Sequence, residues 1–229
     1  MKYLYALLGL VLITSCATPM VYMGSEQDLA KLKQTKVCTY CDLKNADLRD
    51  VNLYEANLTG SDLTGSNIEN ANKANFTDAN LTNADMSSEL YKTANFDGTN
   101  FSNANLTNAM IGLTSLKGAN FNGANLTNTY FGLSKLQNAS FKNATLNNTD
   151  FGLNTVLYRA DFSNAKLINV IFTKGQFAAN LSRANFQNAF LKDIDFVNVR
   201  LDKANFEGAI FCNVKMDYGI KNTGDESCM

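Results

Sequence analysis

An all-β solenoid is the fold class that this sequence predicts, because two periods are superimposed along most of the chain. The shorter period is five residues: a small residue, then Asp or Asn, then Leu or Phe recur in order, as in Ala104-Asn105-Leu106. Five residues fit neither the 3.6-residue period of a helix nor the 2.0-residue period of a strand, and a fixed repeat of this kind indicates a solenoid. We expect the small residue and the Leu or Phe of each unit to face inward.

The longer period is twenty residues and groups four five-residue segments into one coil. Ile111, Phe131 and Phe151 follow one another at this step, so the period predicts that they lie in one column. Asn also repeats at this step, and a ladder of stacked side-chain amides is expected there. The ladder positions are Asn108, Asn128 and Asn148. Eight or nine coils at about 4.8 Å each would make a rod about 40 Å long.

The repeat resembles that of pentapeptide-repeat proteins, and the resemblance covers residues 38–216. It implies a right-handed quadrilateral β-helix. The register breaks at three places, where we expect a bulge or a short loop rather than a binding site. The breaks are steps of eight residues from Ile68 to Phe76, six from Val156 to Phe162 and four from Phe177 to Leu181. The last two breaks cancel in this count, so the columns are expected to continue unchanged after them.

The first residues predict a lipoprotein signal. A charged start precedes an apolar run over residues 3–12, which is too short to span a bilayer. Residues 13–16, with the sequence ITSC, resemble the lipobox of bacterial lipoproteins. The resemblance implies that residues 1–15 are removed and that Cys16 becomes the lipidated first residue; an ordinary signal peptide with an incidental Cys is the alternative. Ala17 stands where an Asp would indicate inner-membrane retention, so we expect the outer membrane, facing the periplasm.

The segments on either side of the repeats are expected to be short. Residues 16–24 are predicted to form a tether and residues 25–37 a helical cap, with Ser25 as the N-cap of the helix. The helix would cover the backbone groups that an open solenoid end leaves unpaired. Beyond the repeats, residues 217–229 are predicted to form a C-terminal cap or tail.

Four cysteines flank the repeats in two pairs, Cys38 with Cys41 and Cys212 with Cys228. Both pairs resemble the cysteines at the two ends of many pentapeptide-repeat proteins, and in an oxidising compartment the resemblance implies two disulfides. A zinc site is the alternative, but the pairs would be separated by a rod about 40 Å long, and the sequence has no His to complete either pair. We therefore expect no metal ion and no cofactor.

The composition argues against an enzyme. The chain has no His and no Trp, which excludes Ser-His-Asp, Cys-His and imidazole-metal chemistry. Its Asp residues precede the central Leu or Phe at positions that Asn occupies elsewhere, where they are expected to cap turns. Without Lys2, the mature chain has 19 basic and 21 acidic side chains, a balance that indicates neither a nucleic-acid binder nor a polyanion.

One of the four predicted outward columns departs from the polar background. Three columns are polar throughout, whereas the fourth is largely apolar and is joined by three Leu residues that follow its central positions. An apolar face on a polar rod is not expected to remain bare in water. The predicted interaction face comprises Leu90, Met110, Leu113, Tyr130, Leu133, Leu153, Ile171, Phe190 and Ile210.

Three occupants of this face are open: the protein's own tails, another protein, and the membrane surface. We favour a protein, which would be a second rod lying side by side or another envelope protein. The sequence thus predicts a non-catalytic envelope lipoprotein that acts as a rigid scaffold or protein-binding module. The family resemblance also offers a DNA mimic that binds gyrase, which export and the near-neutral charge oppose. A polysaccharide- or peptidoglycan-binding rod is a further alternative, although few aromatic side chains point outward.

Overall fold

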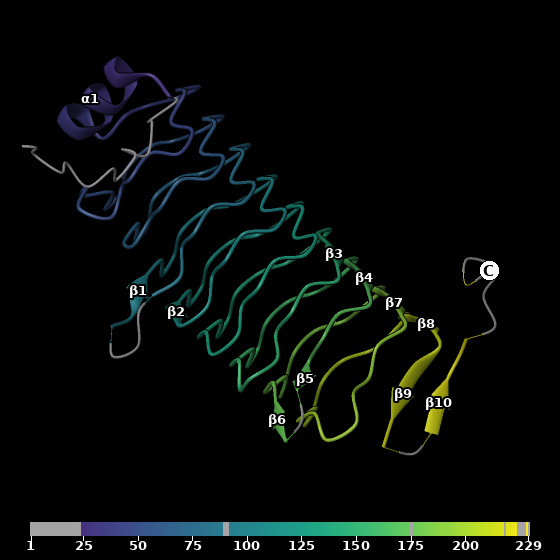
Figure 1. Ribbon diagram of the computed structural model, residues 1–229. Helices are drawn as coiled ribbons and strands as arrows, with labels where there is room; N and C mark the ends of the chain where they lie inside the picture. The colour runs from purple at the N-terminus through teal and green to yellow at the C-terminus, as the bar shows by residue number, and fades with distance from the viewer. Residues whose placement is uncertain (1–23, 89–91, 175, 218, 224–227, 229) are drawn as a thin grey trace, which may run out of the picture.

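The computed structural model describes residues 24–88, 92–174, 176–217, 219–223 and 228. In this part of the chain the coils stack into a rod, with a short helix at one end and a two-stranded hairpin at the other (Figure 1). The predicted signal peptide, Cys16, most of the predicted tether and Leu90 lie outside the described residues. Among the described helices, none has the length and apolar character needed to cross a membrane.

The helix α1 spans Glu26–Thr35, and its start confirms the expected N-cap. The Ser25 hydroxyl accepts a hydrogen bond from the Asp28 N–H at 3.1 Å, which satisfies one of the free donors of the first turn. At the other end, Lys36 adopts a left-handed conformation (φ 57°) and donates its N–H to the Leu32 carbonyl, which ends the helix. Leu32 is buried, so the helix covers the first coil (Figure 1).

The twenty-residue repeat appears as four columns of parallel bridges that run along the rod. Within a column, the N–H of each central residue donates to the following coil, as Leu126 does to the Thr145 carbonyl at 2.8 Å. The preceding outward residue donates to the coil before, as Asn125 does to the Ala104 carbonyl at 3.0 Å. We number the columns first to fourth by the residues at which they start, Val37, Asp42, Asp47 and Asn70.

The described part of the chain contains nine coils, which we number by their position in the first column. Coils 1 to 9 begin at Val37, Asn57, Asn75, Asn100, Asn120, Ser140, Asp161, Asn185 and Asn205. Most bridges are single, and only some segments are long enough to count as strands. In the fourth column, β1 (Ala94–Asn95) pairs with β2 (Thr114–Ser115). In the second, a parallel sheet contains β3 (Thr145–Asn147), β4 (Lys166–Ile168), β7 (Phe190–Lys192) and β8 (Ile210–Cys212).

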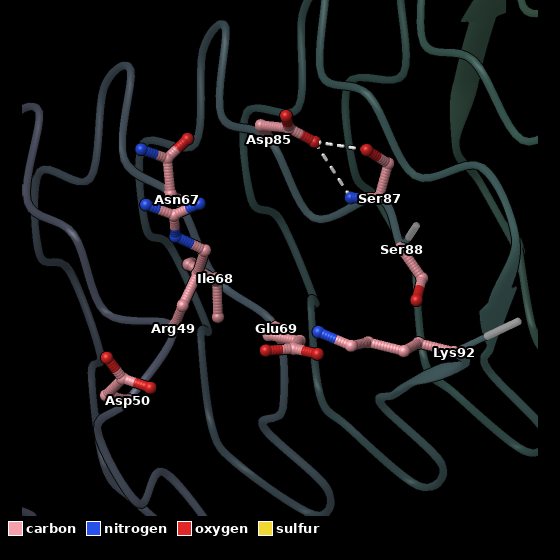
Figure 2. A pocket seen from close by; sticks show the side chains of 9 residues that line it. All are labelled: Arg49, Asp50, Asn67, Ile68, Glu69, Asp85, Ser87, Ser88 and Lys92. Carbon is pink, nitrogen blue, oxygen red and sulfur yellow. Dashed lines mark hydrogen bonds between the residues drawn. The ribbon is translucent and has the colours of Figure 1, made fainter. Parts of the chain in front are cut away.

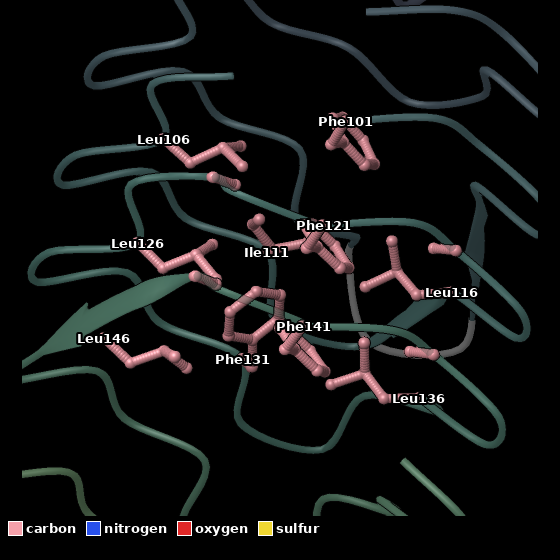
Figure 3. Close-up of a cluster of buried hydrophobic side chains, with 14 of the residues drawn as sticks. Phe101, Leu106, Ile111, Leu116, Phe121, Leu126, Phe131, Leu136, Phe141 and Leu146 are labelled. Atoms are coloured by element: carbon pink, nitrogen blue, oxygen red, sulfur yellow. The ribbon is translucent and has the colours of Figure 1, made fainter. Parts of the chain in front are cut away.

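The core is a set of stacked side chains along the rod axis. Neighbouring Phe rings of the first column stack with centroids between 4.8 and 5.3 Å apart. This ladder contains Phe76, Phe101, Phe121, Phe141, Phe162, Phe186 and Phe206. Rings of the third column meet it edge-on, as Phe131 meets Phe121 at 86° (Figure 3).

The two stacking predictions are confirmed. Phe131 and Phe151 stack at 4.9 Å, and the Ile111 N–H bonds to the coil of Phe131 through the Tyr130 carbonyl at 2.8 Å. The Asn128 amide donates to the Asn108 side-chain oxygen at 3.0 Å, and Asn148 donates to Asn128 at 3.1 Å. The ladder continues one coil further to Asn83, which accepts from Asn108 at 3.0 Å.

The first register break differs from the prediction. The fourth-column segment of coil 2 is short, because Asn70 follows only three residues after the bridged Asn67. Coil 3 then carries an insertion: the Met86 N–H bonds to the Met110 carbonyl, and among the described residues the next bridge begins at Ala94, the first residue of β1. Asp85, rather than Leu90, is therefore the coil 3 partner of Met110. The prediction placed Leu90 before Met110 because it counted the insertion as a regular segment, and Leu90 itself lies outside the described residues.

The later register break also displaces part of the predicted face. Residues after Phe172 leave the coil as an antiparallel hairpin of β5 (Thr173–Lys174) and β6 (Phe177–Ala178), and Phe177 is 41% exposed instead of central. The predicted count therefore contains one segment too many. As a result, Phe190 and Ile210 bridge in the second column with Lys166, and the third column continues from Ile171 to Asp195.

Both ends of the rod are closed by short segments. The structure pairs Cys38 with Cys41 next to α1, and Cys212 of β8 with Cys228. A hairpin of β9 (Val214–Met216) and β10 (Gly219–Lys221) covers the last bridge of the third column. The Phe211 N–H donates to the Thr223 hydroxyl at 3.3 Å, so the C-terminal segment also satisfies a donor of the last coil.

Candidate functional site

The turns between columns occupy equivalent positions in successive coils, so the residue types at one turn can be compared with those at the others. Most turns contain a residue with positive φ, a conformation that Gly, Asn and Asp adopt at least cost. With the exception of Tyr40, the turns from the first to the second column and from the second to the third contain only these three types. They are Gly60, Asp78, Asn103, Gly123, Asn143, Asn164, Asn188 and Gly208, and Asn45, Gly65, Asn83, Asn108, Asn128, Asn148, Asn169, Asp193 and Asn213.

The turn from the third to the fourth column departs from this rule in three successive coils. Leu113, Leu133 and Leu153 occupy it with φ of 60°, 63° and 55°. A branched apolar side chain in this conformation costs about 1–2 kcal/mol at each position. These Leu side chains are only partly buried, and 44% of Leu133 is exposed, so core packing does not compensate for that cost.

The Leu row borders apolar side chains of the third column, and together they form one surface on coils 4 to 7. Met110 is 47% exposed and Ile171 is 42% exposed, whereas Tyr130 is half-buried. We call this surface the apolar patch. It consists of Met110, Leu113, Tyr130, Leu133, Leu153 and Ile171.

Two glycines let the Tyr130 ring lie against the wall of the patch. A Cβ atom at Gly112 would stand 2.7 Å from the ring, and one at Gly132 would collide with the ring and its hydroxyl. Burial, and then the nearby Asp150 carboxylate, raise the pKa of the Tyr130 hydroxyl above its usual value. The ring is therefore held in one position and stays neutral at physiological pH.

Asp150 interrupts the patch between Tyr130 and Ile171 in the third column. Its carboxylate accepts a hydrogen bond from the Gly152 N–H at 2.8 Å and lies 3.8 Å from the Lys174 ammonium. The side chain is only 18% exposed, so it adds little polar area to the surface. The patch consequently remains mainly apolar across the position of Asp150.

Six of the nine residues predicted for the interaction face make up the patch. Phe190 and Ile210 are half-buried in the second column, beside Lys192 of the same strand as Phe190, and do not join it. Leu90 lies outside the described residues. The prediction identified the apolar character of coils 4 to 7 because their repeat is regular, and it failed where insertions changed the count.

A polar pocket of about 410 Å³ beside coils 1 to 3 was not predicted from the sequence (Figure 2). Its lining residues come from coil 1, from the short segment of coil 2 and from the insertion of coil 3. Arg49 is held at one wall by two hydrogen bonds to Asp47, at 2.8 and 2.6 Å, which raise the pKa of the guanidinium. On the other wall Asp85 accepts from the Ser87 N–H at 2.9 Å. Asp47 lies outside the lining, so its contact and that of Asp85 only hold the walls in place, and we assign the pocket no chemistry.

The N-terminal cysteines lie close to a carboxylate, yet the group has a structural role. Ligand atoms of Asp28, Cys38 and Cys41 lie within 4.8 Å of one another. The two sulfurs are bonded to each other and so offer no thiolate to a metal. The Asp28 carboxylate accepts a hydrogen bond from the Asp42 N–H at 3.0 Å, which ties α1 to the first coil.

Comparison with known proteins gives one family match. The family described as pentapeptide repeats matches, in eight copies, residues 37–70, 70–88, 93–112, 114–152 and 179–217. No curated protein matches the sequence.

Solved structures resemble the chain at low identity. HetL, a pentapeptide-repeat protein involved in heterocyst differentiation regulation in the cyanobacterium Nostoc, is 23% identical over 86% of this chain and 98% of its own, with a TM-score of 0.35. QnrB1, a plasmid-mediated fluoroquinolone resistance protein, is 20% identical over 66% of this chain and 78% of its own, with a TM-score of 0.29. These similarities carry no argument about function.

Proposed function

This chain belongs to the pentapeptide-repeat family, and from that membership we propose that it is a non-catalytic rod that binds protein through the apolar patch. The family match points to no catalytic family. For the coil itself we propose right-handed winding and a quadrilateral cross-section. Four bridged columns per coil support four sides.

The observation that carries the proposal is the Leu row at Leu113, Leu133 and Leu153. Each residue combines an unfavourable backbone conformation with an apolar side chain that is only partly buried. Asn or Gly at these turns would remove both costs, as they do at most other turns of the rod. Local strain that the fold does not need is typical of binding sites.

The dimensions of the patch favour a limited contact. It spans coils 4 to 7, a length of about 14 Å at the usual strand spacing. A stable dimer buries about 800 Å² on each partner, which is more than a patch of this length provides. We therefore favour an extended segment of another envelope protein as the partner, with the side-by-side pairing of two rods as the second form of the proposal.

The patch is tested by Tyr130→Asp combined with Leu133→Asp. Asp tolerates the turn conformation at position 133, so we expect the circular dichroism spectrum of the variant to match that of the wild type. Crosslinking in intact envelopes, read by mass spectrometry, should lose a product that the wild type forms. Size-exclusion chromatography with light scattering distinguishes a second copy from a different protein. A wild-type chain that forms no crosslink and remains a monomer would refute the proposal.

The proposed cellular address is the outer membrane, facing the periplasm, with a lipid anchor at Cys16. The lipobox-like sequence before Cys16 supports it. The anchor is tested by Cys16→Ser in cells labelled with palmitate. We expect the Cys16→Ser protein to lose the palmitate label and to leave the membrane fraction. If the wild type and the variant distribute equally between the soluble and membrane fractions, the anchor is contradicted.

The two other candidate functions have weaker support. A DNA mimic needs an acidic rod, but the outward columns include the basic residues Lys135, Lys166 and Arg200 among the Asn residues. A polysaccharide-binding rod needs a row of exposed rings, and exposed Tyr40 and Tyr54 belong to the first coil, away from the patch. Neither candidate explains the Leu row.

A further inference from the structure

Basic side chains are concentrated on one side of the rod. Between coils 4 and 8, the fourth column with its flanking turns and the β5–β6 hairpin has seven basic residues and one acidic residue, Asp202. We call these seven the basic side: Lys117, Lys135, Arg159, Lys174, Arg183, Arg200 and Lys203. Over the same coils, the other three columns have three basic residues and four acidic ones. These are Lys142, Lys166 and Lys192, and Asp150, Asp161, Asp193 and Asp195.

The turn from the fourth to the first column brings three of these charges into a row. Arg159, Arg183 and Lys203 occupy it in coils 6, 7 and 8, with φ of 59°, 60° and 58°. Neighbouring coils are about 4.8 Å apart, so like charges in such a row repel one another. In the three preceding coils the same turn contains Gly98, Gly118 and Asn138, which adopt this conformation at lower cost.

The repulsion is not neutralised within the described part of the chain. Arg159, Arg183 and Lys203 form no ion pair with any described residue. The Tyr158 ring instead lies 5.2 Å from the Arg159 guanidinium and 6.0 Å from that of Arg183, which attracts both cations weakly. All three side chains are exposed. The row is therefore available to anions outside the chain.

We propose that the basic side binds the surface of an anionic phospholipid bilayer. Several exposed cations on one side of a rigid rod, without a directional acceptor pattern, suit a layer of phosphate headgroups. The Leu row borders the same column on its other edge, and adjacent basic and apolar side chains are typical of interfacial membrane binding. Bound in this way, the rod lies parallel to the membrane. The basic residues bind anionic headgroups whether or not a protein occupies the apolar patch, and whether or not Cys16 carries a lipid.

The test uses the unlipidated chain from Ala17 to Met229, which contains every described residue, with vesicles of phosphatidylglycerol and phosphatidylcholine. We expect sedimentation with the anionic vesicles that weakens as salt is added, and none with pure phosphatidylcholine. The variant combines Arg159→Asn, Arg183→Asn and Lys203→Asn, which suit the turn conformation and leave the fold intact. Its partition into anionic vesicles should fall by about 100-fold.

The matched control removes the same number of charges from the other columns, by Lys142→Asn, Lys166→Asn and Lys192→Asn. We expect it to bind within about threefold of the wild type, because these side chains are not on the bound side. An equal loss in both variants would show attraction by net charge alone and overturn the proposal. The proposal would also be overturned if the wild-type chain did not bind vesicles that contain phosphatidylglycerol. The same holds if the chain bound polyglutamate or an oligonucleotide but no vesicles.

Discussion

At the residue scale, the turns show which side chains serve the coil and which serve another purpose. Asn128 adopts the positive φ at little cost and donates to Asn108 in the preceding coil, so one residue stabilises both the turn and the stack. Leu133 and Arg183 adopt the same conformation without such a ladder contact. Leu133 departs from the Asn, Asp and Gly that occupy the first-to-second and second-to-third turns of the same coils, and its departure can be seen in the structure at once.

The Asp side chains cap turns as the sequence predicted, and Asp161 shows how one of them responds to acid. Partial burial acts to raise its pKa, but hydrogen bonds from Ser163 and the Lys142 ammonium at 3.2 Å lower that pKa below its usual value. A carboxylate with a lowered pKa in the folded state stabilises the protein above its unfolded pKa. This contribution is lost as the pH falls through the folded pKa.

We therefore predict that Asp161→Asn reduces the loss of stability between about pH 4 and pH 2. Asn185, the next residue of the column, accepts from the Gln187 N–H at 3.1 Å, so Asn can keep the turn. The free energy of unfolding in urea is to be compared at both pH values. An acid-dependent loss identical to that of the wild type would contradict the assignment to this carboxylate.

At the element scale, the two disulfides close loops of different length. Cys212 and Cys228 are 16 residues apart, whereas Cys38 and Cys41 are separated by three. In the chain-entropy account, the longer loop stabilises by about 3 kcal/mol and the shorter by about 2 kcal/mol. The longer one also keeps the C-terminal segment near the last coil, where Thr223 contacts Phe211.

Accordingly, Cys228→Ser should lower the free energy of unfolding more than Cys41→Ser does. Hydrogen exchange should increase locally at β8, β9 and β10, because these elements lose the covering segment. Exchange in α1 serves as the internal reference and should remain unchanged. Uniformly faster exchange along the rod would indicate that the C-terminal cap is not a separate unit.

Regular elements could be predicted from the sequence, and the irregular ones could not. Ser25 and the apolar pattern after it identified α1, and the twenty-residue period identified the stacked columns. Phe177 misled the count because it is an apolar residue at a spacing typical of the core, although it lies on the exposed hairpin. An inserted hairpin can be distinguished from a coil segment only by the pairing of β5 with β6. That pairing follows no repeat in the sequence, so it could not be predicted.

At the scale of the whole molecule, the Phe ladder joins the coils into one cooperative unit. The rings from Phe76 to Phe186 are fully buried, and the inner ones stack between rings of the neighbouring coils, as Phe141 does between Phe121 at 4.9 Å and Phe162 at 4.8 Å. Stability in such an array depends on contacts between neighbours, so a defect inside it affects the coils on both sides.

We predict that Phe141→Ala costs about 3–5 kcal/mol, because it leaves a cavity and removes two ring contacts. Phe141→Leu should cost about 1–2 kcal/mol, since Leu58 fills the equivalent position in coil 2 and shows that the column accepts it. Urea denaturation followed by circular dichroism measures both variants. Equal costs for the two substitutions would mean that ring stacking contributes nothing to the array.

The rod as a whole has one row on each edge of its fourth column, a row of Leu on one edge and a row of Arg and Lys on the other. The Leu row could be partly predicted from the sequence because those residues follow a regular repeat. The basic row could not be recognised, because the insertion at the hairpin hides which residues are stacked. Both rows adopt a backbone conformation that lowers the stability of the rod. We propose that the Leu row is kept because it binds a partner.

The most direct measurement of that claim combines Leu113→Asn, Leu133→Asn and Leu153→Asn. The free energy of unfolding and the envelope crosslink are to be measured on the same protein. We predict that stability rises by about 3–6 kcal/mol, at about 1–2 kcal/mol for each of the three turns, because Asn relieves the turn strain, while the crosslinked partner is lost. A variant that is less stable than the wild type and still forms the crosslink would contradict the account.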